Sequence, residues 1–390
     1  MSDHDFSLSR RTAGIAASPV ARALAGLAAL AVAMGIGRFA FTPVLPMMLQ
    51  DAGLSLAGGG LLASANYLGY LLGALSATAI RVRPERAIRF GLAAVGIVTL
   101  AMGLSLPFAA WALLRLLAGV ASAWILISVS AWCLEALAVY QRPFLNSVVF
   151  AGVGTGIATA GLLCVMLTST GAASTDAWLA LGAVSLLVCV LIWRFFPTHA
   201  PVESKDAPSP RSRYQWDARS IRLVCCYGVF GFGYIIPATF LPVMAKQALQ
   251  GSPLFGWSWP VFGLAAALST LAVAALVRRT GNRRLWIACH FIMAAGIILP
   301  VMSSHLLAIF AAALCVGGTF MVITLAALQE AKRVAGRYAT TLIAAMTSAF
   351  AAGQIIGPLT VASDGNGFAP GLIAAAVLLV VSALALNKDH

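Results

Sequence analysis

The sequence contains very little charge. Lys, Arg, Asp and Glu make up 9% of its 390 residues, against roughly 25% in an ordinary soluble domain. Apolar residues make up 61%. A soluble core of this length cannot use so many apolar side chains, so lipid must surround much of the surface. The composition therefore indicates an integral membrane protein.

The sequence also lacks motifs of catalysis and cofactor binding. It has no Walker-type phosphate loop, no Ser/His/Asp arrangement, no paired carboxylates and no metal-ligand spacing. All seven cysteines fall in apolar runs without a CxxC pair, which predicts small buried hydrophobic residues. We therefore expect no enzyme, no cofactor and no metal, and ATP-driven transport is disfavoured.

Twelve apolar segments are long enough to cross a bilayer, which requires roughly 20 residues per helix. The sequence predicts an all-α membrane protein of twelve transmembrane helices near 21–49, 59–80, 87–106, 109–137, 143–169, 177–196, 221–248, 259–279, 285–303, 306–329, 338–361 and 370–387. A Pro-, Ser- and charge-rich stretch separates the first six from the last six. The predicted organisation is a tail 1–20, an N-terminal half 21–196, a linker 197–220, a C-terminal half 221–387 and a tail 388–390.

Basic residues are distributed unequally between the two sides of these spans. The loops after helices 2, 4, 6, 8 and 10, the two termini and adjoining helix ends hold 22 of the 25 Lys and Arg, whereas the opposite loops hold only Lys246. Because cytoplasmic loops are enriched in Lys and Arg, we expect both termini and the linker in the cytoplasm. The net charge of +13 then reflects topology, and we expect no nucleic-acid partner.

The two halves repeat with a shift of 196 residues. Residues 35–48, GIGRFAFTPVLPMM, align with 231–244, GFGYIIPATFLPVM, so that Gly35, Gly37, Leu45 and Pro46 meet identical residues. Six helices separate the copies, so both halves keep the same orientation in the membrane. Two parallel six-helix halves are the architecture of the major facilitator superfamily.

Several motifs resemble one branch of that superfamily. The GIGRFAFTPVLPMM run resembles the YbfB/YjiJ-like family, whose members are bacterial inner-membrane proteins, and GQIIGP at 353–358 is similar to the superfamily as a whole. Arg115-Leu-Leu-Ala-Gly119 is similar to the helix 4 motif RxxQG, with Ala118 in place of Gln. The helix 2–3 loop motif is reduced to Arg81-Val-Arg-Pro-Glu-Arg86, and the helix 5 antiporter motif lacks its proline, so proton antiport does not follow from the resemblance.

Arg38 is the most unusual residue of the predicted first helix. It lies roughly 25 Å from residue 21 and roughly 16 Å from residue 49 along a helix, beyond the reach of a side chain that extends to the interface. Arg38 therefore needs a partner or a wet cavity. It either faces a transport cavity or anchors helices by hydrogen bonds.

A second arginine, Arg115, enters helix 4 to a depth of roughly 10 Å. None of the twelve Asp and Glu falls in the middle of a span, so the missing negative charge is expected to arrive with the substrate. Arginine suits a carboxylate or phosphate because its planar fork donates two parallel hydrogen bonds. The alternative pairs Arg115 with backbone carbonyls or interfacial lipid.

Other polar residues complete the predicted substrate site. Tyr234 aligns with Arg38 in the repeat, so the N-terminal half is cationic where the C-terminal half is aromatic. Asn66, Tyr67 and Gln354 are further candidates, although lone polar residues in membrane helices more often join helices than bind ligands. Such a pocket suits an organic anion with an apolar body.

Two further groups are expected to support transport. Prolines remove an N–H and free a carbonyl one turn earlier, so we predict helix kinks at Pro43, Pro46, Pro237 and Pro242. We predict cytoplasmic gate salt bridges between Glu135 and Glu330 at helix ends and basic loops that include Arg83 and Arg279. The alternative for the gate residues is a surface ion pair worth under about 1 kcal/mol.

The sequence thus predicts a monomeric secondary transporter that moves a small organic solute, with an organic anion favoured, across the bacterial inner membrane by alternating access. Its expected partners are the small-molecule substrate and the lipid bilayer. Two alternatives remain: efflux of hydrophobic compounds, indicated by aromatic residues on helices 4 and 7, and a membrane receptor that keeps the fold without transport.

Overall fold

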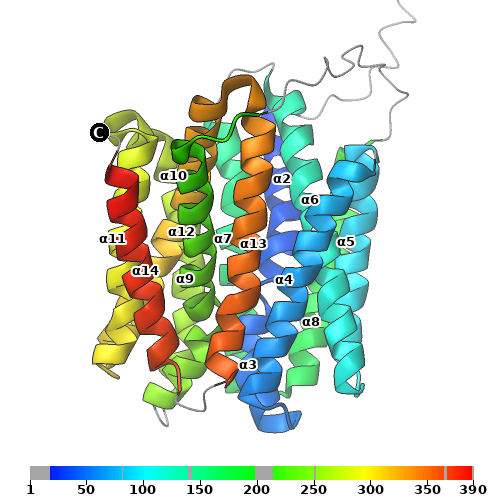
Figure 1. The fold of residues 1–390 in the computed structure, drawn as a ribbon. Helices are drawn as coiled ribbons and strands as arrows, with labels where there is room; N and C mark the ends of the chain where they lie inside the picture. Colours follow the sequence, from blue (N-terminus) through cyan, green and yellow to red (C-terminus); the bar gives the residue numbers. More distant parts are fainter. Residues whose placement is uncertain are drawn as a thin grey trace, which may run out of the picture.

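The structure is a computed structural model. It describes residues 18–80, 82–138, 143–197, 214–249, 252–363 and 367–388, and the side chains at 78, 134–138, 143 and 362–363 lie outside the description. The described chain folds into a bundle of long helices that run between two ends (Figure 1). We name the end where the first helix begins and the last one finishes the terminal face, and the opposite end the distal face.

The N-terminal half holds α2, η1 and α3 in the first span and five longer helices after it. Their bounds are α2 Pro19–Leu30, η1 Ala31–Ile36, α3 Phe41–Asp51, α4 Leu56–Ala79, α5 Pro84–Ala101, α6 Phe108–Ala138, α7 Pro143–Ser169 and α8 Ser174–Ile192, followed by the short η2 Trp193–Phe195.

The C-terminal half contains six long helices and two short ones. Their bounds are α9 Ala218–Ala248, η3 Pro253–Trp257, α10 Ser258–Thr280, α11 Asn282–Met302, α12 Leu306–Ala335, η4 Gly336–Tyr338, α13 Ala339–Ser363 and α14 Ala369–Asn387. Helix α9 begins inside the range predicted as linker, because Asp217 caps it by accepting a hydrogen bond from the main-chain N–H of Ser220 at 2.8 Å.

The prediction of twelve helices requires a correction. In the described chain, eleven α-helices of 18 or more residues are continuous, α4 to α14, whereas the first span is interrupted between α2 and α3. Nine stretches of the described chain are long and apolar enough to cross a membrane by length and composition, and two of them join α2 to α3 and α12 to α13. Helices α4 and α5 are not in this set. The first two turns of α5 contain three charged residues, Glu85, Arg86 and Arg89, which lower its apolar content.

Helix packing repeats between the halves. In the N-terminal half α2 packs on α7, α4 on α6 and α5 on α8; the corresponding contacts in the C-terminal half are α9 on α13, α10 on α12 and α11 on α14. The halves meet along two seams, α4 with α13 and α7 with α10. These seams are also related by the 196-residue shift, so the sequence repeat is a structural repeat.

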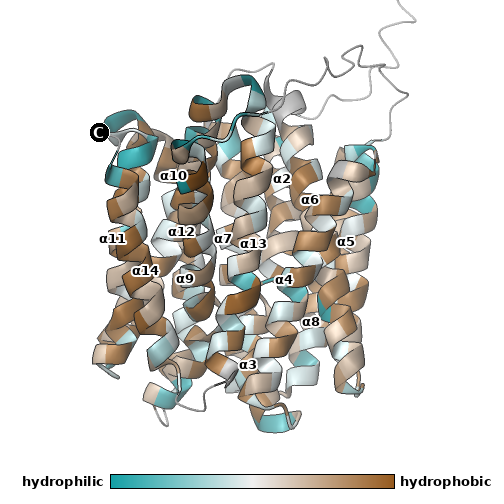
Figure 2. Cartoon of the chain, viewed as in Figure 1, coloured by the Kyte–Doolittle hydropathy of each residue, from teal (hydrophilic) through white to brown (hydrophobic). Residues whose placement is uncertain are grey.

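The outer surface of the bundle is apolar and its interior holds polar groups. Figure 2 shows hydrophobic residues along the helices and hydrophilic ones gathered toward the terminal face. Phe90 and Val190 are 68% and 71% exposed, a surface that needs lipid contact. Arg38, Asn66, Arg115 and Gln354 are buried instead.

The break in the first span follows from local sequence. The main-chain N–H groups of Gly37 and Phe39 donate five residues back, to Val32 and Met34, in a π-type turn. Pro43 has no N–H to offer the Phe39 carbonyl, and Thr42 N donates to that carbonyl at 3.2 Å. The Arg38 carbonyl, which Thr42 N would otherwise serve, is thereby left for a side chain of another helix.

Glycine allows this irregular segment to lie against its neighbours. A Cβ at Gly35 would lie 2.4 Å from Gly156 Cα in α7, and one at Gly37 would lie 2.5 Å from Ser122 Oγ in α6. The same hydroxyl donates to the Ala33 carbonyl at 2.7 Å, a carbonyl that the π-type turn releases. Gly35 and Gly37 therefore permit the close approach of the first span to α7 and α6.

Candidate substrate site between the two halves

Arg38 lies at the centre of the candidate site, on the irregular segment between η1 and α3. Its side chain is 2% exposed, and Nη2 donates to Gln354 Oε1 of α13 at 3.0 Å, which links the two halves. Its Nε is buried without a hydrogen-bond partner. Within the described ranges no carboxylate forms an ion pair with it. An uncompensated buried charge is costly, and the acceptor that the chain offers to Arg38 is a neutral amide oxygen.

Aromatic rings surround the Arg38 guanidinium. Its Cζ lies 3.9 Å from the ring centroid of Tyr70, 5.4 Å from that of Tyr67 and 5.3 Å from that of Phe39. Each ring face attracts the cation and offsets part of its desolvation. Sequence reasoning missed Tyr70, although it follows Tyr67 by three residues and therefore shares its helix face.

Arg115 has a structural position. It is 2% exposed, and its Nη1 and Nη2 donate to the carbonyls of Gly37 and Arg38 at 3.3 and 3.0 Å. Its Cζ lies 4.9 Å from the Phe41 ring centroid. These are the carbonyls at the break of the first span. The geometry thus matches the alternative prediction, in which Arg115 pairs with backbone carbonyls, and its substrate role is not tested.

Asn66 and Tyr67 also connect helices. Asn66 Nδ2 donates to the carbonyls of Gly37 at 3.2 Å and Arg115 at 2.8 Å, while its Oδ1 is buried without a partner. The Tyr67 hydroxyl forms a hydrogen bond of 3.0 Å with Thr239 Oγ1 in α9. Asn66 therefore supports the break in the first span, and Tyr67 joins the halves beside Arg38.

Gln354 connects the two residues that the repeat makes equivalent. Its Oε1 accepts from Arg38, and its Nε2 donates to the hydroxyl of Tyr234. Tyr234 stacks on Phe320 and Phe350, with ring centroids 5.6 Å away in both cases. The structure thus brings Arg38, Gln354 and Tyr234 together, with a cation on one side and an aromatic cluster on the other.

The prolines act on the distal side of this site. Pro242 cannot donate to the carbonyl of Ala238, and Thr42 Oγ1 of the other half donates to that carbonyl at 2.6 Å. Thr42 and Ala238 are themselves equivalent in the 196-residue repeat. Helix α9 continues through Pro237 and Pro242, and α3 continues through Pro46. Of the four prolines predicted to kink helices, Pro43 is the one that follows the break in the first span, at residues 37–40.

A cavity lies on the distal side of the same region. Its volume is about 430 Å³, and its walls come from α3, α7, α9 and η3. Pro43, Pro46 and Pro242 line it, but Arg38 and Arg115 do not. Thr42 and its bond to Ala238 belong to the α3–α9 contact beside this cavity. The predicted cationic residues therefore lie in a packed region beyond the cavity wall.

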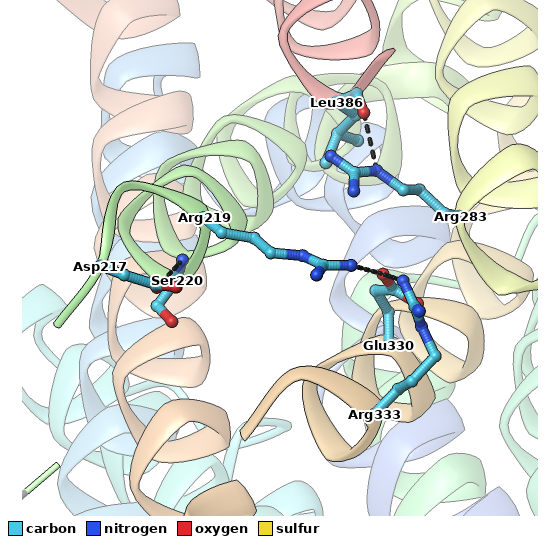
Figure 3. Close-up of polar contacts among 7 residues, drawn as sticks. All are labelled: Asp217, Arg219, Ser220, Arg283, Glu330, Arg333 and Leu386. Carbon is cyan, nitrogen blue, oxygen red and sulfur yellow. Dashed lines mark hydrogen bonds and ion pairs between the residues drawn. The ribbon is translucent and has the colours of Figure 1, made fainter. Parts of the chain in front are cut away.

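The predicted gate residues lie toward the terminal face. Glu330 accepts from Arg333 Nε and Nη2 at 2.8 and 2.6 Å, and Arg219 Nη2 lies 3.7 Å from it (Figure 3). All three residues belong to the C-terminal half. Arg279 is exposed and Arg83 half-buried, while the Glu135 side chain lies outside the description. A salt bridge between the halves stays a prediction.

Comparisons with known proteins place the whole chain in context. The family described as "Uncharacterised MFS-type transporter YbfB" matches residues 30–387. A protein of Bacillus subtilis (strain 168), "Uncharacterized MFS-type transporter YceJ", is 27% identical over 277 residues, 67% of this chain and 68% of that protein.

Solved structures share the fold. The nucleoside transporter NupG superposes with a TM-score of 0.72 at 12% identity, covering 94% of this chain and 98% of that one. A mutant of NupG gives the same TM-score at 14% identity, with 94% and 99% coverage.

Proposed function

This chain belongs to the YbfB family of MFS-type transporters, and on that premise we propose that it moves a small organic anion by alternating access. The observation that carries the proposal is Arg38, which is 2% exposed, has an unpaired Nε and bonds to a neutral amide oxygen. A substrate carboxylate would replace Gln354 Oε1 with a charged acceptor. The present bond already has a charged donor; a carboxylate makes the acceptor charged as well and offers two oxygens to the guanidinium fork.

The surroundings of Arg38 support a substrate with an apolar body. Tyr70 and Tyr67 line one side of the cation, and Tyr234 and its stacked rings lie on the other side of Gln354. Small-molecule sites are typically apolar with a few placed polar groups. One fixed cation among rings favours an aromatic or aliphatic acid over an inorganic anion.

Hydrogen bonds between the halves support alternating access. Thr42 binds the Ala238 carbonyl at 2.6 Å, Tyr67 binds Thr239 at 3.0 Å, and Ser64 Oγ donates to the Ile355 carbonyl at 2.9 Å. We infer that these bonds hold the distal side closed and break when the halves rock apart. A neutral hydrogen bond contributes only about 1 kcal/mol net, so a few of them can be exchanged reversibly.

Orientation and assembly are part of the proposal. The basic residues of the terminal face support a cytoplasmic location for both termini in the bacterial inner membrane. We propose a monomer, because each half supplies part of one site between them. Glu330 and its arginines would then lie at the cytoplasmic side, where a gate is expected.

A second candidate is transport of neutral aromatic or hydrophobic compounds. The aromatic cluster of Tyr234, Phe230, Phe320 and Phe350 favours it, with centroid distances of 5.1 to 5.6 Å around Tyr234. Neutral hydrophobic compounds and nucleosides, the latter because NupG is a nucleoside transporter, therefore belong in the test panel.

Uptake into proteoliposomes from a panel of organic acids, nucleosides and hydrophobic compounds, with and without a pH gradient, tests the proposal. We expect uptake of an organic acid. Arg38→Ala should weaken it roughly 10- to 150-fold, since a hydrogen bond to a charged group contributes about 1.5–3 kcal/mol. Arg38→Lys should restore it only in part, because lysine lacks the planar fork.

The matched control is Arg284→Ala, which removes an exposed arginine of the terminal face and should leave uptake unchanged. Normal uptake by Arg38→Ala would refute the site. Uptake of neutral compounds alone would favour the second candidate. No flux of any solute under either gradient would favour a receptor that keeps the fold.

A further inference from the structure

We propose that the distal cavity is a second binding site, which takes small organic monoanions with an apolar or aromatic body. The cavity of about 430 Å³ lies between α3, α7, α9 and η3, with walls from both halves. Its volume falls within the range of roughly 300–1,000 Å³ typical of ligand pockets. The interpretation of the cavity as a staging site for substrate rests on the proposed function. Binding of an anion to the cavity does not require transport.

Lys246 supplies the charge of this site. Its Nζ donates to Gln50 Oε1 at 2.8 Å and to the Pro46 carbonyl at 3.3 Å, and an ammonium group has three N–H donors. One donor is thus left for a ligand. Gln50 and Lys246 are equivalent in the 196-residue repeat, so their contact lies where the two halves meet.

The acidic residue of the cavity, Asp51, is hydrogen-bonded to the start of α8. Asp51 Oδ2 accepts from the Ser174 main-chain N–H at 2.6 Å, and Oδ1 accepts from Ser174 Oγ at 2.7 Å. Ser174 is the first residue of α8, where the helix dipole favours a negative charge. Both carboxylate oxygens therefore accept from Ser174, and the start of α8 offsets part of their charge.

The remaining walls suit an apolar body. Pro46, Pro242, Phe255 and Trp257 line the cavity, and Lys246 Nζ lies 5.8 Å from the Phe255 ring centroid. A carboxylate on Lys246 would place an attached ring among these side chains. The Arg38 guanidinium likewise lies beside an aromatic ring, that of Tyr70. The two cations are separated by the Thr42–Ala238 contact.

The test is protection of a cysteine in the cavity wall, measured on the purified full chain in detergent. Ser169 lines the cavity and is exposed, so Ser169→Cys reports access to a charged methanethiosulfonate reagent, above the background of the parent. Benzoate should slow the labelling. Benzamide, its neutral isostere, should protect with an affinity lower by about tenfold or more, since its oxygen carries no negative charge to attract the Lys246 ammonium.

A second substitution in the Ser169→Cys protein shows which residue binds the protecting benzoate. Lys246→Gln should abolish protection by benzoate, and Lys246→Arg should keep it. Arg38→Ala should also keep it, because Arg38 does not line the cavity. Equal protection by benzamide, protection that persists in Lys246→Gln, or protection lost in Lys246→Arg or Arg38→Ala would overturn the inference. Labelling involves no flux, so this result and the uptake result can fail independently.

Discussion

Replacing Gln354 by glutamate gives Arg38 a permanent carboxylate inside the protein. The two groups are already in contact, with Nη2 to Oε1 at 3.0 Å, and the Tyr234 hydroxyl beside the amide nitrogen can donate to a carboxylate oxygen. The substitution preserves shape and adds one negative charge. A substrate anion must then compete with a tethered one.

The magnitude follows from the charges. At an effective dielectric constant of 20, opposite charges about 4 Å apart attract by about 4 kcal/mol. The bond that substrate displaces in the parent contributes about 1.5–3 kcal/mol. The cost of burying the new carboxylate is present with and without substrate and cancels. A net penalty of about 1–2.5 kcal/mol remains, so apparent affinity should fall about 5- to 70-fold.

The assay is the concentration dependence of uptake in proteoliposomes for the best organic acid of the panel. Gln247→Glu adds the same charge at an exposed position of α9 and should leave uptake unchanged. Gln354→Met removes the acceptor without adding charge and should not weaken substrate binding. Parent-like affinity in Gln354→Glu, or an equal loss in Gln354→Met, would refute the idea that substrate replaces Gln354 on Arg38.

Three further substitutions test the framework of the site. Arg115→Met should lower the free energy of unfolding by roughly 1–3 kcal/mol, because the buried Arg38 carbonyl loses its donor while the Gly37 carbonyl keeps that of Asn66; unchanged thermal unfolding in detergent would contradict this. Gly35→Ala forces a Cβ to 2.4 Å from the α7 backbone and should cost about 1–3 kcal/mol or more. Gly318→Ala, with open space at the Cβ, should be neutral or stabilising on the same thermal measurement. Thr42→Val leaves the buried Ala238 carbonyl of α9 without its donor and should lower the free energy of unfolding by about 1–3 kcal/mol; a parent-like thermal unfolding curve would argue against this role of Thr42.

The sequence by itself determined the membrane fold. Apolar runs, the bias of Lys and Arg and the 196-residue repeat depend on local composition and periodicity, and they led to two six-helix halves. The repeat also indicated where the halves differ, because Arg38 has no cationic counterpart at Tyr234. The absence of acids from the middle of the spans pointed to an uncompensated cation before any contact was known.

Tertiary structure decided what each polar residue does. Arg115 and Asn66 look like ligands in the sequence, yet both donate to carbonyls released where the first span breaks. Gln354 and Arg38 lie 316 residues apart and meet only through the packing of the two halves. A proline or a π-type turn frees a carbonyl, but the sequence does not indicate which side chain will donate to that carbonyl. The donor is whichever side chain the packing brings close. The sequence therefore predicted which polar residues are buried in the spans, and the packing of the two halves decided which groups each of them contacts.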